Sequence, residues 1–293
     1  MKNTINRESN NRRLLQSFKG VETSDGAGVK LTRIIGSPKL NMLDPFLLLD
    51  CFESDDAADY IGGFPAHPHR GFETVTYILD GCMRHRDNFG HEGIIEAGGV
   101  QWMTAGRGIL HSEMPEQKEG LLKGFQLWIN LPASAKMIEP TYQEYSNELT
   151  PIEHRPDGTL IRVISGQTNQ GIKGPINNDY VDPIFLDVAL QENTSFLQQL
   201  PESHNAFVYL ISGNLNVIGE VQDLEFNQQV TQNELCILSK GDQLLVKSDD
   251  LGARFLLLAA RPLNEPVVRS GPFVMNTKEE IFQAYEDFSS GNF

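Results

Sequence analysis

Cysteine is scarce in this sequence, and its three copies are poorly placed for a disulfide framework. Cys51, Cys82 and Cys236 are odd in number and widely spaced, and none forms a C-x-x-C pair. A disulfide-stapled secreted domain and a cysteine zinc site are therefore not indicated. The first residues, MKNTINRESNNRRLL, are polar and contain no apolar segment of a signal peptide. We expect a cytoplasmic protein with reduced thiols.

Positive charge is also in short supply, which narrows the classes of partner. Lys and Arg total 24 against 39 Asp and Glu, so the formal net charge is −15. A surface of that sign repels phosphate backbones, and direct nucleic-acid binding is not expected. No apolar run is long enough to cross a bilayer, so no membrane association is expected. The chain also lacks a G-x-x-x-x-G-K-[ST] phosphate cradle and any local nucleophile signature.

Helical periodicity is rare, and short strand-like runs take its place. Segments such as VTYILDG, GFQLWINLP, LIRVISG and ARFLLLAA are rich in β-branched or aromatic residues and are bounded by Gly, Pro, Asn or Asp. Such punctuation predicts an all-β barrel or sandwich. One helix is expected near the C-terminus. Thr277 followed by Glu280 forms a capping box, and Ile281, Phe282, Ala284, Tyr285 and Phe288 follow at helical spacing.

An internal repeat predicts two similar β domains. TVTYILDG at 74–81 resembles AFVYLISG at 206–213, and WMTAGRG at 102–108 resembles ILSKGDQ at 237–243. The offsets are 132 and 135 residues. We therefore expect a metal-binding barrel at 20–131, a proline-rich linker at 132–174, a second barrel without metal ligands at 175–265, and a C-terminal segment with the helix at 266–293.

Two short motifs in the first copy have the chemistry of metal ligands. His67 and His69 stand two apart, as do His111 and Glu113. Residues i and i+2 of a strand share a face, so each pair points together and two neighbouring strands could bring all four to one point. Imidazole nitrogens and a carboxylate suit a borderline divalent metal such as iron, nickel, copper, zinc or manganese. With four protein ligands, an octahedral ion keeps two positions open for reactants.

The second copy provides an internal comparison. Shifted by 132, the H-x-H histidines fall on Gln199 and Pro201. Shifted by 135, His111 and Glu113 fall on Val246 and Ser248. The second copy thus repeats the strand pattern but lacks the three histidines and the glutamate. A functional site that is present in the first copy and absent from the second explains this difference better than strand packing does.

Other interpretations of these residues remain open at this point. A single H-x-H is a weak signal, and a lone histidine is more often satisfied by hydrogen bonds than bound to a metal. Glu73 is a rival ligand, because it lies four residues after His69 and would share its face in a regular strand. The remaining histidines have no partner at ligand spacing and are expected on the surface or in loops: His85, His91, His154 and His204.

Four longer stretches together resemble the pirin family of the cupin superfamily: FPAHPHRGFETVTYILDG, AGRGILHSEMPE, GFQLWINLP and RPLNEPVVRSGPFVMNT. The resemblance extends from about Val29 to about Thr277. It implies two tandem cupin barrels, a bicupin, with metal in the N-terminal barrel only. It also implies iron, Fe2+, as the metal and the ligand set His67, His69, His111 and Glu113, and so favours Glu113 over Glu73.

The resemblance implies quercetin 2,3-dioxygenase activity, in which a flavonol or similar aromatic enol is cleaved with O2 and carbon monoxide is released. The metal would act as Lewis acid and template, and Glu113 would be both ligand and general base. Two alternatives stay open. The first, implied by the resemblance to some eukaryotic pirins, is an iron-binding, redox-responsive regulator that acts through a protein partner. The second is a metalloprotein whose flavonol cleavage is a side activity.

Overall fold

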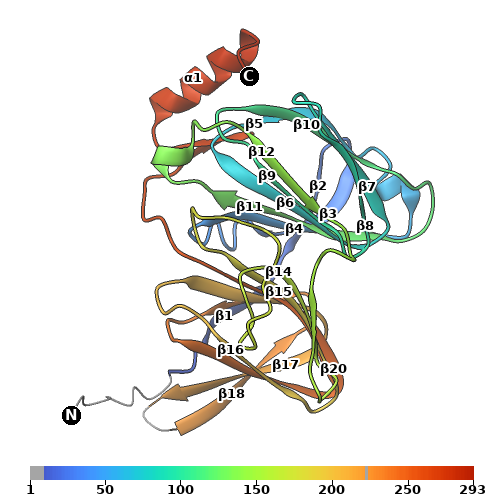
Figure 1. Cartoon of the computed structure of the whole chain (residues 1–293), viewed down its shortest axis with the longest axis vertical. Helices are drawn as coiled ribbons and strands as arrows, with labels where there is room; N and C mark the ends of the chain where they lie inside the picture. The colour runs from blue at the N-terminus through green and yellow to red at the C-terminus, as the bar shows by residue number, and fades with distance from the viewer. Residues whose placement is uncertain (1–9, 222–223) are drawn as a thin grey trace. The chain divides into compact units, whose positions relative to one another are not determined.

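The computed structural model describes residues 10–221 and 224–293, which form an almost entirely β protein with one α-helix near the C-terminus (Figure 1). The predictions of an all-β chain and of this helix are confirmed. Two compact units divide the chain. The leading unit contains residues 20–150, 175–182 and 262–293, and the trailing unit contains residues 151–174 and 183–261 with the segment that ends at Lys19.

The stretch 132–174, expected to be a linker, contributes strands to both units. It contains β12 (Thr141–Tyr145), which belongs to a sheet of the leading unit, and β13 (Ile152–His154) and β14 (Leu160–Ser165), which belong to the trailing unit. Pro140 and Pro151 each stand immediately before a strand, where the missing amide hydrogen is tolerated. These prolines therefore mark strand boundaries here.

The leading unit contains two large antiparallel sheets and a two-stranded one, the hairpin of residues 268–275. The seven-stranded sheet has the order β12, β9 (Val100–Thr104), β6 (Phe72–Asp80), β11 (Leu122–Asn130), β4 (Phe46–Ser54), β3 (Val29–Ile35) and β2 (Val21–Asp25). The four-stranded sheet has the order β5 (Phe64–His69), β10 (Ile109–Pro115), β7 (Cys82–Asp87) and β8 (Glu92–Glu96). Short 3-10 turns occur at Ala57–Asp59 and Ala133–Ala135.

The leading unit has an apolar core and a polar region along the same strands. Ile78 of β6, Met83 of β7 and Ile95 of β8 pack with Phe52 and four other buried residues in one cluster. Each such side chain contributes roughly 1.5–3 kcal/mol through removal from water. Earlier in β6, Thr76 is buried too but is polar. The strands that form the core thus also position polar side chains between the sheets.

A buried lysine fixes the turn between β5 and β6. The Lys136 ammonium donates to the carbonyl oxygens of Gly71 (2.7 Å) and Val274 (3.0 Å) and to Asn130 Oδ1 (2.6 Å). Burial lowers its pKa to about 8. Gly71 has φ of 88°, and a Cβ there would lie 2.0 Å from the Val274 oxygen, so only glycine fits. The segment that follows His69 is therefore rigidly held.

The helix α1 (Lys278–Ser289) begins as predicted. The Thr277 hydroxyl accepts from the Glu280 backbone amide, and the Glu280 side chain accepts in return from Thr277, which completes the capping box. Ile281 and Ala284 are buried against the short hairpin of β21 (Val268–Ser270) and β22 (Phe273–Met275). Phe282, which the sequence placed on the same face, is 67% exposed. The apolar stripe is therefore narrower than expected.

The trailing unit is one antiparallel assembly with a filled interior. Its strands are β1 (Leu14–Lys19), β13, β14, β15 (Ile184–Leu190), β16 (Ser195–Gln199), β17 (Asn205–Val221), β18 (Leu224–Thr231), β19 (Glu234–Leu238) and β20 (Gln243–Ala260). A single cluster of 22 buried residues occupies its interior. The positions that correspond to the candidate ligands differ in burial: Val246 is in that cluster and Ser248 is buried, while Gln199 and Pro201 are exposed.

Candidate metal centre

Three of the four predicted ligands converge between the sheets of the leading unit. His67 and His69 lie on β5, and the antiparallel register places His111 of β10 opposite His67. One ring nitrogen from each of the three lies within 4.8 Å of the others. β5 is an edge strand, so Pro65 and Pro68 cost no ladder hydrogen bond on its open side. The H-x-H spacing thus produces the predicted shared face.

The hydrogen-bond pattern leaves ring nitrogens available to a cation. His67 Nδ1 lies 2.8 Å from the Pro65 carbonyl oxygen, which can only accept, so Nδ1 carries the proton and Nε2 a lone pair. His67 Nε2 is 3.0 Å from His69 Nε2. His111 Nε2 is buried without a hydrogen-bond partner among the described residues. A divalent cation would satisfy such atoms, so the donor set fits a metal ion.

Burial also keeps the three imidazoles neutral. His69 and His111 are 3% and 2% exposed. Desolvation, and then the neighbouring imidazoles, hold the pKa values of both rings well below the usual value. Burial lowers the pKa of His67 as well. Neutral imidazole is the form that binds metals, so no proton has to leave these rings near neutral pH.

Glu113 lies next to this cluster in a different hydrogen-bonding environment. The pairing of β10 with β5 shifts register between His111 and Glu113. The Glu113 carboxylate is buried and accepts a hydrogen bond from Thr76 Oγ1 of β6. Burial raises its pKa to about 7, against the opposing effect of the Thr76 bond. Glu113 lines the same cavity as His67 and His69, but its oxygens are not in the group within 4.8 Å.

Glu73, the rival ligand, points away from the histidines. The chain turns at Gly71 between β5 and β6, so a count of four residues from His69 does not preserve the strand face. Phe72 touches the His69 ring, with centroids 5.0 Å apart, and Glu73 alternates to the opposite face. There its carboxylate accepts from Thr104 Oγ1 (2.7 Å) and from the Asn178 amide. The expectation that Glu73 shares the face of His69 is wrong.

A cavity of about 590 Å³ lies beside the imidazoles. This volume is in the range of sites that enclose small organic molecules. Its apolar walls include Leu31, Leu48, Phe52, Phe64, Trp128 and Pro272. The Trp128 ring lies 5.1 Å from the His69 ring, so an aromatic surface extends directly from the histidines.

Two arginines in the cavity wall have different surroundings. Arg33 is held by Asp50 through two hydrogen bonds, of 2.9 and 2.7 Å, and by Asp25 at 2.7 Å. Arg269 lies over the Trp128 ring, 4.7 Å from its centroid. Sequence reasoning missed Trp128 and Arg269. The alternation in GFQLWINLP, which places Gln126 and Trp128 on one face of β11, was the available signal for the former.

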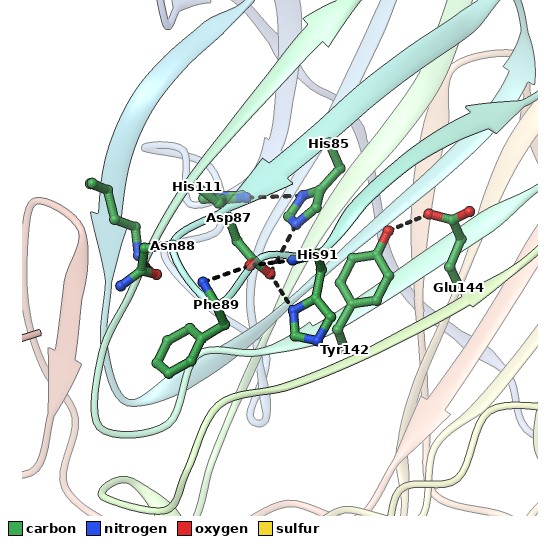
Figure 2. Close-up of polar contacts among 9 residues, drawn as sticks. His85, Asp87, Asn88, Phe89, His91, His111, Tyr142 and Glu144 are labelled. Carbon is green, nitrogen blue, oxygen red and sulfur yellow. Dashed lines mark hydrogen bonds and ion pairs between the residues drawn. The ribbon is translucent and has the colours of Figure 1, made fainter.

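A second polar cluster stands behind His111 (Figure 2). His111 Nδ1 lies 3.5 Å from His85 Nδ1, and His85 Nε2 lies 3.4 Å from Asp87 Oδ2. The same carboxylate oxygen is 2.8 Å from Nδ1 of His91. The His85 side chain is completely buried, and His204 of the trailing unit is 2% exposed. The expectation that His85 lies on the surface or in a loop is wrong, because it is enclosed within β7 by packing that spacing alone does not reveal. His204 does lie in a loop, just before β17, although it is buried there.

The fold and the histidine cluster define a metal-site β-barrel protein of the cupin type. Comparison with known proteins agrees. The Pirin family model matches residues 28–129, and the model of the Pirin C-terminal cupin domain matches residues 185–293. The chain therefore belongs to the pirin family, and the expected bicupin fold is confirmed.

Individual relatives cover nearly the whole chain. A pirin-like protein of Caulobacter vibrioides is 50% identical over 96% of this chain and 99% of its own length. A Pseudomonas aeruginosa protein named "Putative quercetin 2,3-dioxygenase PA3240" is 44% identical over 96% of this chain and 97% of its own. The crystal structure of a quercetin 2,3-dioxygenase from Acinetobacter baumannii matches with a TM-score of 0.84 and 33% identity, covering 97% of this chain and 98% of that one.

Within the described residues, no helix has both the length and the apolar character needed to span a bilayer. α1 has only 12 residues.

Proposed function

We propose that this chain is a metal-dependent dioxygenase of the pirin type, which cleaves a flavonol such as quercetin with O2. The proposed ion is Fe2+, held by His67, His69, His111 and Glu113. The main supporting observation is the convergence of three neutral imidazoles, one with an unpartnered buried nitrogen, beside a cavity of substrate size. The names of the Pseudomonas relative and of the Acinetobacter structure support the same chemistry.

The bound metal would supply Lewis acidity and a template that brings the deprotonated substrate and O2 together. The protein's part is to hold it on three neutral nitrogens and one carboxylate. The Glu113 carboxylate reaches this set only by turning from its Thr76 contact, since its oxygens lie outside the histidine group in the metal-free chain. Its three side-chain torsions allow such a change.

Glu113 is also the proposed acceptor of the substrate's hydroxyl proton. With a pKa raised to about 7 by burial, its carboxylate is a stronger base than an ordinary glutamate at neutral pH. Proton transfer to Glu113 would leave the substrate as its enolate, the form that ring cleavage requires.

The cavity walls account for an aromatic substrate. Trp128 and Phe52 offer ring surfaces, and Leu31 and Leu48 exclude water from the space between them. The Arg269 guanidinium at Trp128 provides a positive charge near the enolate. Arg33 is less available to a substrate, because Asp25 and Asp50 already occupy its donors.

The test begins with metal analysis of the native protein. Quercetin is then added under anaerobic conditions, air is admitted, and O2 uptake and carbon monoxide release are followed. We expect about one iron per chain and turnover in the wild type, and loss of both in His111→Ala. His154→Ala is the matched control, because His154 is exposed and belongs to the trailing unit. A protein with stoichiometric iron that consumes neither quercetin nor O2 would overturn the proposal and would favour the regulatory alternative.

A further inference from the structure

We propose that Asp87, acting through His85, fixes the tautomer of His111 so that its Nε2 lone pair faces the metal position. This inference rests on the proposed role of His111 as a ligand. It assigns a positioning function to two residues that lie outside the predicted ligand set. Both residues come from β7, the strand paired with β10 on the side opposite β5.

Asp87 is anchored from two directions. Its Oδ1 accepts from the backbone amides of Phe89 (2.9 Å) and His91 (3.0 Å). Its Oδ2 faces His85 Nε2 and His91 Nδ1, as Figure 2 shows. The side chain is 0% exposed. Because two backbone amides donate to Oδ1 and two ring nitrogens face Oδ2, the side chain acts as a hydrogen-bond acceptor at both oxygens, as a carboxylate does.

The proton positions follow in sequence along this cluster. A carboxylate only accepts, so His85 Nε2 must carry the proton that faces Asp87. The His85 side chain is completely buried, where a charged ring would be costly, and its proton is on Nε2, so its Nδ1 bears a lone pair. That lone pair faces His111 Nδ1 at 3.5 Å, which must then be the donor. The remaining nitrogen of His111, Nε2, is left with the lone pair, and it is the buried atom that lacks a partner.

Packing holds the rings of this cluster in place. The Tyr142 ring stacks on His91, with centroids 5.0 Å apart and planes at 5°, and lies 4.9 Å from the His85 ring. The Tyr142 hydroxyl donates a hydrogen bond to the Glu144 carboxylate, and this bond fixes the position of the Tyr142 ring. An orienting carboxylate behind a metal-binding imidazole is a recurrent device, and its removal typically weakens metal binding by about 10–100-fold.

Asp87→Asn is the decisive substitution, because the backbone determines how the new amide is oriented. The amides of Phe89 and His91 need an acceptor, so the Asn oxygen takes the place of Oδ1 and its NH2 group faces His85 Nε2. His85 must then accept through Nε2 and carry its proton on Nδ1. His111 in turn must accept through Nδ1 and carry its proton on Nε2, where it blocks the metal.

Two measurements follow from this reasoning. Nitrogen-15 NMR of histidine-labelled, metal-free protein should show His111 protonated at Nδ1 in the wild type and at Nε2 in Asp87→Asn. Calorimetric titration with Ni2+ alone should show at least tenfold weaker binding in the variant. His91→Gln is the control: it removes the other side-chain partner of Asp87 without touching His85, so we expect the His111 tautomer and the Ni2+ affinity to stay as in the wild type.

The outcomes separate this inference from the proposed function. An Asp87→Asn protein that keeps the Nδ1 proton on His111 and binds Ni2+ as the wild type does would overturn the inference. A wild type that binds no Ni2+ would overturn the metal site itself, while the NMR comparison would still decide the tautomer. If Asp87→Asn does not fold, His85→Phe serves instead. It removes the acceptor for His111 Nδ1, and we expect a mixture of His111 tautomers; an unchanged spectrum would refute the role of His85.

Discussion

Glu73→Gln should change how the stability of the leading unit depends on pH. Glu73 is 1% exposed, and burial raises its pKa from 4.5 to about 7 despite hydrogen bonds from Thr104 and Asn178. The folded state thus retains a proton that the unfolded chain has already released. Folding free energy is therefore lost as the pH rises from the unfolded pKa to the folded pKa, and the loss is complete above about pH 7.

The magnitude follows from the size of the pKa difference. Each pKa unit corresponds to about 1.4 kcal/mol, so the full cost of ionising Glu73 is roughly 3 kcal/mol. Part of this cost is already present at pH 5. The free energy of unfolding of Glu73→Gln minus that of the wild type should therefore be higher at pH 8 than at pH 5, by roughly 2–3 kcal/mol. Glutamine fits the site, because its oxygen can accept from Asn178 while its amide donates to the Thr104 hydroxyl.

The assay can isolate the leading unit. Both tryptophans of the chain, Trp102 and Trp128, belong to it, so their fluorescence during denaturant unfolding reports that unit alone. The free energy of unfolding of Glu73→Gln and of the wild type is measured in EDTA at pH 5 and at pH 8. Subtracting the wild-type value at each pH cancels the titration of all other groups. Glu53→Gln, at an exposed carboxylate of the same unit that pairs with Lys123, is the control substitution. An equal stability difference at the two pH values would refute the argument, and an altered Ni2+ affinity would revive Glu73 as a ligand.

Three further predictions address the cavity, the metal and the trailing unit. Trp128→Leu removes the ring beside His69 and should raise KM for quercetin at least several-fold with a smaller change in kcat, as steady-state kinetics would show; an unchanged KM would separate Trp128 from substrate binding. Removal of metal with EDTA should abolish O2 uptake, and re-addition of Fe2+ should restore it, whereas persistent uptake would contradict the metal requirement. Arg12→Met should destabilise the trailing unit by roughly 3 kcal/mol or more, measured by hydrogen exchange of its amides. The reason is that the Arg12 guanidinium donates to the carbonyl oxygens of Pro201, His204, Ser239 and Gly241. All four would lose this hydrogen bond, and Pro201 would keep only the donor it has in the His204 amide; unchanged exchange rates would refute this.

The features that sequence reasoning predicted are those encoded by local periodicity. Alternation in a strand requires His67 and His69 to share a face, and the capping pattern at Thr277 requires a helix to begin there. The internal repeat predicted two β units because it compares the chain with itself. The approach of His111 to the first pair needed the extra assumption that β5 and β10 are neighbours, which the resemblance to a known family supplied.

The features that escaped prediction depend on which strands become neighbours. Glu73 follows His69 by four residues, yet the turn at Gly71 reverses its face. Asp87 follows His85 by two residues in its own strand, but only the pairing of β7 with β10 brings His85 against His111. Arg269 reaches the cavity from a segment 141 residues after Trp128 in sequence. Such long-range adjacency leaves no trace in a local pattern.

The packed interior of the trailing unit sets a limit on protein engineering. Writing the four candidate ligands into the equivalent sites of that unit would place two of them on the outside, at Gln199 and Pro201. The others would replace Val246, enclosed by aliphatic and aromatic groups, and Ser248, whose hydroxyl donates to the Gln191 carbonyl oxygen. A second catalytic centre there would first require smaller side chains in place of several members of this apolar cluster, because those residues fill the interior of the unit.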